Sequence, residues 1–463
     1  MRSHFNSTVE NRKMRDQKSH AMMLTVAFAV FAFVAFSPLG FSADAAATDS
    51  KGGFRSGFSN AISDFQAKLP AIFREPSPED VGTKPRLKTH FGATTSYTSD
   101  ADLTTKETNP AWLARVSGGL RLEMPVGDRL YTEVGYTASF GTVQGRGVSA
   151  NTVSHDLSAL ARYKLTDATQ LGLKHNIQWS QIPNSTDEMF TLSTTTAEVT
   201  HKFSDVLTGR LSDTFQWFQD ELPTQPGFIN QEYVDNTLST GVDYEMTERI
   251  NLLPSFGWTI RNFSNIEGKD YDQYRFILGS TYKLGPQTTL SAHGGYNYRR
   301  FSNGSDRGDH AFIYGVGVVN NISQKLSWNA NYDYNIQDTF DTNFVNVEGS
   351  EATNLDNLDR NFRLIRTHRI GTGATYHLNE RNTFSLFAAA LFARTDAEDN
   401  VIRLTENDET SIEMGPGYSF RINKYISFDL KYIFGRRFTA EDSGSGRTSY
   451  TFHKIGGGIT ASI

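Results

Sequence analysis

The sequence has no cysteine among its 463 residues. That absence excludes disulfides, thiolate metal sites and cysteine nucleophiles together. Hydrophobic residues make up only 38% of the chain and the mean hydropathy is −0.44. After residue 45 no apolar run approaches the roughly 20 residues that a helix needs to cross a bilayer. The net charge of −6 comes without a long basic run in this part, so nucleic acid is not an expected partner.

The N-terminus has the layout of a secretory signal. Basic residues precede an apolar run from Ala21 to Phe36, and small residues surround Ala43 and Ala45. This order of a basic region, an apolar region and an A-x-A site is typical of a signal peptide. We predict that residues 1–45 are a signal peptide and that the rest is exported. The alternative is an uncleaved N-terminal anchor.

Residues 46–85 form a separate segment. Apolar residues recur at helical spacing from Phe54 to Leu69, and four prolines between Pro70 and Pro85 then extend the chain. We predict a periplasmic N-terminal segment with a short amphipathic helix. The helix could be a small plug, a docking site for a periplasmic partner, or a helix lying on the membrane surface.

From residue 86 to residue 463 the chain repeats one pattern. Segments of about ten residues alternate apolar and polar side chains, as strands do. Leu326–Ile336 is an example, with apolar or aromatic residues at every even position and polar residues at every odd one. Short connections lie at 125–128, 166–167, 204–205, 247–248, 285–287, 323–324, 379–381 and 423–424. Longer hydrophilic connections lie at 99–109, 144–152, 183–188, 220–230, 265–270, 303–309, 339–361, 396–409 and 440–447.

Eight short and nine long connections require eighteen strands. Their alternation is typical of an all-β, antiparallel up-and-down transmembrane β-barrel with tight periplasmic turns and long extracellular loops. Aromatic residues occur on the apolar parity at both strand ends, as they do at two membrane interfaces. Examples are Tyr163 and Phe203 beside short turns, and Phe140 and Phe392 beside long connections. A soluble all-β sandwich is the alternative.

The polar parity of such a barrel would face its interior. A barrel of 16–18 strands is wide enough to leave an aqueous channel. Basic residues exceed acidic ones on this parity, which predicts a preference for anions. The alternative is that these charges pair across strands and solvate the wall. The candidate pore-lining residues are Arg115, Arg121, Arg162, Lys174, Arg210, Arg261, Arg275, Arg299, Arg363, Arg369, Lys431, Asp235, Asp333 and Glu413.

The longest connection, 339–361, carries acids such as Asp341 and Glu348 and precedes the basic stretch 360–369. It could fold into the lumen as a constriction, or it could be an external loop. Both alternatives stay open.

Enzyme motifs are missing from the chain. There is no HExxH, GxSxG, P-loop or EF-hand pattern. Ser154, His155 and Asp156 are adjacent, but neighbours in a strand point to opposite faces, so they do not form a catalytic set. We therefore expect a protein that is not an enzyme, with no catalytic residues, cofactor or metal.

Three features give a family resemblance. They are a Pro-bearing lead-in at Lys84–Arg86, a first strand ending in Thr95–Asp100, and hairpins that meander to the C-terminus. The chain resembles outer-membrane β-barrel porins, and more narrowly those found beside exopolysaccharide-export genes. It departs from the usual terminal Phe, since it ends in Ile463.

The resemblance implies a passive or polysaccharide-associated pore in the cell outer membrane of a Gram-negative bacterium. It also implies contact with membrane lipid and the assembly machinery, and homo-oligomers are common in this class. We expect a pore for small hydrophilic or anionic solutes. The alternatives are an outer-membrane component of polysaccharide or lipid export and, third, an outer-membrane enzyme.

Overall fold

The computed structural model describes residues 85–99, 110–145, 148–181, 189–220, 232–264, 270–302, 308–338, 364–396, 407–439 and 450–462. The predicted signal peptide, the predicted helix at 54–69 and the connection 339–361 lie outside these ranges. The described residues form eighteen strands and no helix. The strands are β1 (Arg86–Thr98), β2 (Ala111–Val126), β3 (Leu130–Gly145), β4 (Val148–Lys164), β5 (Thr169–Gln181), β6 (Met189–Ser204), β7 (Leu207–Asp220), β8 (Tyr233–Glu245), β9 (Ile250–Phe263), β10 (Tyr271–Lys283), β11 (Thr288–Phe301), β12 (Gly308–Asn320), β13 (Leu326–Asp338), β14 (Leu364–His377), β15 (Asn382–Asp396), β16 (Asn407–Arg421), β17 (Ile426–Thr439) and β18 (Tyr450–Ser462).

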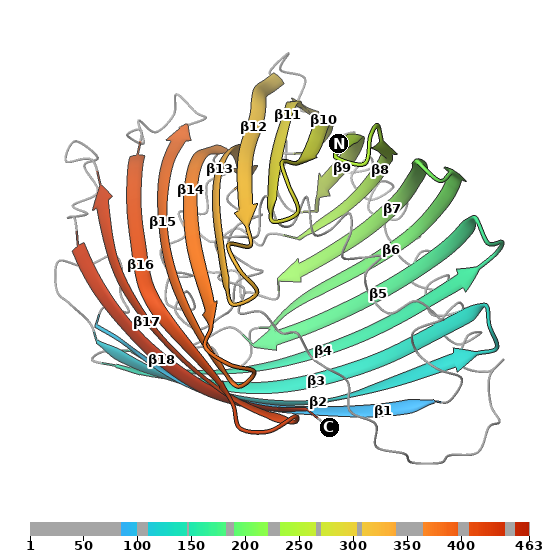
Figure 1. Cartoon of the computed structure of the whole chain (residues 1–463). Helices are drawn as coiled ribbons and strands as arrows, with labels where there is room; N and C mark the ends of the chain where they lie inside the picture. Colours follow the sequence, from blue (N-terminus) through green and yellow to red (C-terminus); the bar gives the residue numbers. More distant parts are fainter. Residues whose placement is uncertain are drawn as a thin grey trace, which may run out of the picture. The chain divides into compact units, whose positions relative to one another are not determined.

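The strands form one closed sheet. Each strand pairs antiparallel with the next, and β18 pairs with β1, with Phe91 opposite Ala461 and Tyr97 opposite Ile455 (Figure 1). The predicted eighteen-stranded barrel and the predicted return of the last strand to the first are confirmed. Every strand thus has a neighbour on both sides, as a sheet that crosses lipid requires, although the ladder between β12 and β13 covers only Tyr314–Asn320 of β12.

The eight short connections are tight turns, and in most of them a local side chain accepts backbone hydrogen bonds. In the turn between β14 and β15, Asn379 Oδ1 accepts hydrogen bonds from the backbone N–H groups of Arg381 and Asn382, both at 2.9 Å. Asn423 accepts the same pair of bonds in the turn before β17. These are Asx turns, in which the side chain takes the place of a backbone acceptor.

The predicted long connection at 144–152 is wrong. Strand β3 continues to Gly145 and β4 begins at Val148, so only residues 146–147 separate them. Ser149 and Asn151 belong to the ladder, opposite Gln144 and Thr142. Polar residues are tolerated in a strand that projects beyond the bilayer, so their polarity did not mark the loop.

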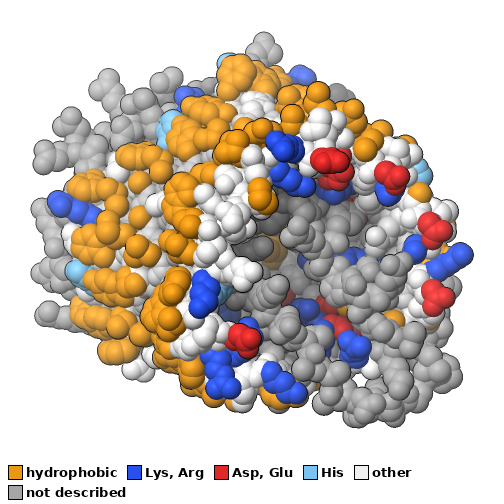
Figure 2. Space-filling view, viewed as in Figure 1, with side chains coloured by type: hydrophobic (Ala, Val, Ile, Leu, Met, Phe, Trp, Pro, Cys, Tyr) orange, Lys and Arg blue, Asp and Glu red, His pale blue; other side chains and the backbone are white. Residues whose placement is uncertain are grey.

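The two faces of the sheet differ sharply in chemistry. Large hydrophobic side chains are exposed on the outer face, including Leu87 at 62%, Trp112 at 59% and Phe312 at 71%. Figure 2 shows hydrophobic side chains gathered on the outside and charged side chains around a hollow. An apolar surface of this extent is not stable in water and indicates that the outer face contacts membrane lipid. The fold is that of an integral outer-membrane β-barrel.

Candidate functional site

The inner face carries the charged residues that the sequence singled out. On β9, for example, Arg261 alternates with the outward Phe256 and Trp258, and their parity is fixed by the ladder with β10. The same parity argument places thirteen candidates on the inner face, and Arg363 lies outside the described residues. The thirteen are Arg115, Arg121, Arg162, Lys174, Arg210, Asp235, Arg261, Arg275, Arg299, Asp333, Arg369, Glu413 and Lys431.

One group of inward residues lies at the long-connection ends of β7 to β11. Arg261 donates to Asp235 Oδ2 from Nη2 at 2.6 Å and from Nε at 3.2 Å, and both side chains are 6% exposed. The Arg261 guanidinium lies 4.4 Å from the ring centroid of Tyr233. Buried charges are tolerated when they are paired in this way. We call this group the rim cluster, and its apolar members are Phe218, Tyr233, Phe263, Tyr271 and Phe301.

Arg299 extends the rim cluster toward β11. Its guanidinium lies 4.2 Å from the centroid of Tyr271, and Nη2 donates to Gln273 Oε1 at 3.0 Å. Arg299 as a residue is 4% exposed. The cluster therefore stabilises the wall, and its guanidinium groups are covered.

The aromatic residues of the rim cluster are not among the predicted site residues, because aromatics near the long connections were expected on the outer face. A signal was present, since an aromatic residue stands two positions from a charged or amide residue on each of four strands. Residues two apart on a strand share a face. The pairs are Tyr233 and Asp235, Arg261 and Phe263, Tyr271 and Gln273, and Arg299 and Phe301.

A second group of inward charges lies at the short-turn ends of β1 to β3. Lys88 Nζ lies 2.5 Å from Glu123 Oε1, and Arg121 Nε lies 3.3 Å from Glu133 Oε1. The Tyr131 hydroxyl donates to Glu133 Oε2 at 2.8 Å. We call these five residues the turn cluster. Its two basic side chains are more open than those of the rim cluster, with Arg121 55% exposed and Lys88 36% exposed, whereas Tyr131 and Glu123 are buried.

The other candidates are distributed round the wall. Arg210 lies 3.6 Å from Asp243, and Asp333 lies 3.2 Å from His293 and opposite Arg369 in the ladder. For these candidates the alternative prediction holds, namely that inward charges pair across neighbouring strands.

The remaining candidates have mixed neighbours. Arg115 donates to Ser139 at 2.9 Å, and the Lys431 ammonium lies 4.6 Å from the ring centroid of Phe387. Arg162 is buried opposite Tyr131. The structure does not bring Lys174, Arg275 and Glu413 together, because they belong to β5, β10 and β16.

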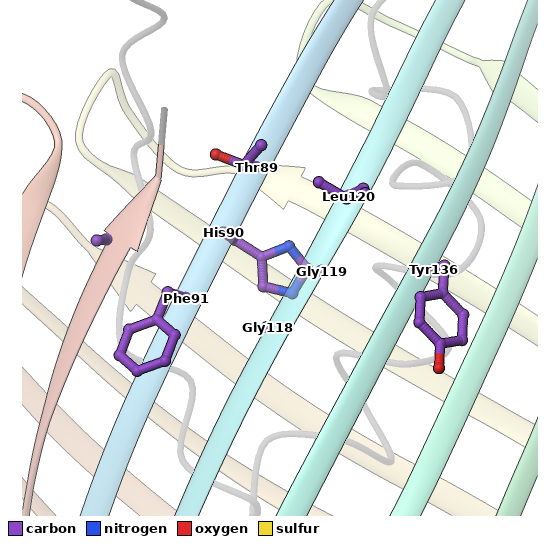
Figure 3. A pocket seen from close by; sticks show the side chains of 8 residues that line it. Thr89, His90, Phe91, Gly118, Gly119, Leu120 and Tyr136 are labelled. Carbon is purple, nitrogen blue, oxygen red and sulfur yellow. The ribbon is translucent and has the colours of Figure 1, made fainter.

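A hollow of about 390 Å³ lies at β1 to β3 (Figure 3). Phe91, Leu120 and Tyr136 line it on the outer face around Gly118, and the His90 ring reaches across to Gly119. Its lining is mostly on the lipid-facing parity, so it is a notch in the outer surface and not part of the channel.

In the described ranges, no group of three or more His, Asp or Glu residues is placed to hold a metal ion. Within the same ranges, no helix has the length and apolar character needed to cross a membrane.

No family model matches the chain, and no curated protein matches its sequence. Several solved structures have a similar fold. OccK5 (OpdH) of Pseudomonas aeruginosa has 12% identity and a TM-score of 0.46, over 81% of this chain and 98% of that one. OccK3 (OpdO) of the same organism has 12% identity and a TM-score of 0.43, over 81% and 95%. The siderophore receptor PirA of P. aeruginosa has 9% identity and a TM-score of 0.45, over 83% and 81%.

With TM-scores below 0.5 these likenesses are loose. The class of this chain follows from its own structure: a closed sheet, an apolar outer band and a charged inner wall define an outer-membrane β-barrel.

Proposed function

We propose that the barrel is a passive outer-membrane channel for small hydrophilic solutes with a preference for anions, and that it is not an enzyme. The observation that supports this most directly is the excess of basic residues on the inner face, with the guanidinium of Arg121 open to water. Fixed charges that line a pore attract counter-ions and set selectivity. Arg261 is buried and paired with Asp235, so it contributes less to this selectivity than the exposed Arg121.

Single-channel recording in planar bilayers tests the proposal. The purified full chain should give stepwise currents, and a KCl gradient should give a reversal potential of the sign expected for chloride preference. Arg121→Glu should move the reversal potential toward cation preference. Arg436→Gln is the matched control, because Arg436 lies on the outer face and should leave selectivity unchanged. Absence of stepwise current, or cation preference in the unmodified protein, would overturn the proposal.

The family resemblance supports a second proposal, an outer-membrane component of polysaccharide or lipid export. In that role residues 48–69 would engage a periplasmic partner. Their deletion should then abolish partner binding in a pull-down and leave conductance intact. If export of polysaccharide by cells is unaffected by the deletion, the diffusion channel is the better account.

A further inference from the structure

Three hairpins carry the same set of side chains on the outer face near the long connections. In each, the first strand has two outward aromatics two residues apart, and the second strand has a histidine directly opposite the second aromatic. An arginine stands two positions closer to the long connection. We call each set a rim module, and the modules are Tyr296, Tyr298, Arg300 and His310 in β11–β12; Tyr332, Tyr334, Arg366 and His368 in β13–β14; and Tyr432, Phe434, Arg436 and His453 in β17–β18.

Two of the three modules share a tyrosine–histidine hydrogen bond, and in the third the rings of Tyr296 and His310 lie 6.2 Å apart between centroids. The hydroxyl of Tyr432 lies 2.7 Å from His453 Nδ1, and that of Tyr332 lies 2.9 Å from His368 Nδ1. Ring centroids are 6.1 Å apart in the first pair and 6.2 Å apart in the second. When the tyrosine hydroxyl donates, the neutral imidazole carries its proton on Nε2. That N–H is then available to a ligand outside the barrel.

The modules lie at the edge of the apolar band. Arg436 is ten residues beyond Ile426, where β17 leaves its short turn. A rise of about 3.4 Å per residue and a tilt of about 40° put it roughly 26 Å above the turn, which is close to the height of the apolar band of such barrels. Arg300, Arg366 and Arg436 are all exposed. Their guanidinium groups therefore lie at the depth of lipid headgroups.

The opposite side of the barrel provides a contrast. Among the described outward residues at the long-connection ends of β2 to β9, no lysine or arginine occurs; Trp112, Gln219 and Asn262 stand there. Hairpin β3–β4 has the tyrosine–histidine pair alone, with Tyr136 Oη 2.7 Å from His155 Nδ1 and no arginine beside it. The arginines are thus confined to one arc.

Acidic neighbours decide which modules are the most positive. Asp272 stands opposite Arg300 in the ladder and offsets its charge. The guanidinium of Arg436 instead lies 4.7 Å from the ring centroid of Phe438, with Thr451 opposite it and His453 diagonal to it. The module on β17–β18 therefore has no acidic residue opposite its arginine, and Arg366 of the module on β13–β14 stands opposite a second arginine, Arg394.

We propose that the rim modules bind the phosphate groups of membrane lipids in the leaflet that meets the long connections. An arginine can give a phosphate two parallel charge-assisted hydrogen bonds, and the imidazole N–H adds a third donor. The paired aromatic rings pack against the glycerol region beneath, where such rings are favoured. The ligand is a lipid because the modules lie outside the closed wall.

Native mass spectrometry of the full chain in neutral detergent tests this proposal. The probes are phosphatidic acid and diacylglycerol, which share their chains and differ in the phosphate. The unmodified protein should retain phosphatidic acid in preference to diacylglycerol. Arg366→Gln/Arg436→Gln should weaken retention of phosphatidic acid about tenfold, as expected for the loss of hydrogen bonds to a charged group.

His155→Gln is the matched control, because it alters the one tyrosine–histidine pair described above that has no arginine beside it. Its retention should equal that of the unmodified protein. Arg436→Lys keeps the charge but loses the two parallel hydrogen bonds of a guanidinium, so it should give intermediate retention. The mobility of unheated protein on gels confirms the folding of each variant. Equal retention of the two probes, or a loss in His155→Gln as large as in the double variant, would overturn the proposal.

Discussion

The rim cluster and the turn cluster use the same residue types for different purposes. In the rim cluster the ion pair of Arg261 and Asp235 is enclosed by aromatic rings, and both side chains are 6% exposed. In the turn cluster Arg121 is 55% exposed, although its partner Glu133 is only 16% exposed. Charge on an inner wall therefore divides into groups that hold strands together and groups that meet the solvent. The face of a strand gives no information on that division.

The largest expected effect comes from breaking the buried pair of the rim cluster. Asp235→Ala should lower the free energy of unfolding by about 3–5 kcal/mol, because it leaves the Arg261 guanidinium buried without its carboxylate. Denaturant unfolding in detergent micelles measures the change. Asp235→Leu/Arg261→Met should recover much of the loss. If Glu133→Ala costs as much as Asp235→Ala, the distinction between the two clusters fails.

A smaller effect tests how tightly the wall beside the turn cluster is packed. A Cβ on Gly119 would lie 2.2 Å from His90 Cε1 and 2.6 Å from the carbonyl oxygen of Tyr136, whereas one on Gly118 would have no neighbour within 3.8 Å. Gly119→Ala should therefore cost about 1–3 kcal/mol, as overpacking does. Gly118→Ala is the control and should be near neutral. Equal unfolding midpoints for the two variants would contradict the packing shown in Figure 3.

The exposed arginine of the turn cluster should matter little for stability. Arg121→Gln should change the free energy of unfolding by less than about 1 kcal/mol, since exposed ion pairs contribute little. The same variant should reduce anion preference in bilayer recordings. A large loss of stability with unchanged selectivity would assign Arg121 to the wall instead of the channel.

The smallest effect is expected in the turn between β6 and β7, outside both clusters. Lys202 Nζ donates to Asp205 Oδ1 at 2.7 Å, and this bond, with the lysine charge, lowers the pKa of Asp205 below its ordinary value of 3.8. A carboxyl whose pKa is lowered by folding stabilises the fold above its ordinary pKa. That contribution is lost as the pH falls through the lowered pKa of the folded state. Asp205→Asn should thus slightly lower thermal stability at neutral pH.

The difference between Asp205→Asn and the unmodified chain should shrink as the pH falls below 3.8 and disappear once the pH is below the lowered pKa of Asp205. Melting curves of both proteins at several pH values measure it. A difference that persists at low pH would assign the effect to the turn backbone and not to the ion pair.

Much of the fold could be predicted from the sequence because one physical pattern repeats. Period-two alternation and turn residues such as Asn379 and Asn423 are local signals, and together they determine strand number and direction. The boundary at 144–152 could not be predicted, because Ser149 and Asn151 suit both a loop and a strand in water.

The candidate site was harder to predict than the fold. Parity placed Arg121 and Arg261 on the same face, yet their exposure depends on rings contributed by other strands, such as Tyr233 and Tyr271. Cross-strand neighbours follow from register, which alternation in single segments does not specify.

The seam between β1 and β18 governs how the molecule can be made. Ser99 and His453 are hydrogen-bonded across 354 positions of the chain. The backbone groups on one edge of β1 therefore have no strand partner until nearly all of the chain is present and β18 can pair with them. Ring closure over so long a stretch is slow, and an open edge in the meantime invites aggregation. The free edge of β1 is thus the part of the sheet most exposed to wrong pairing until β18 is in place.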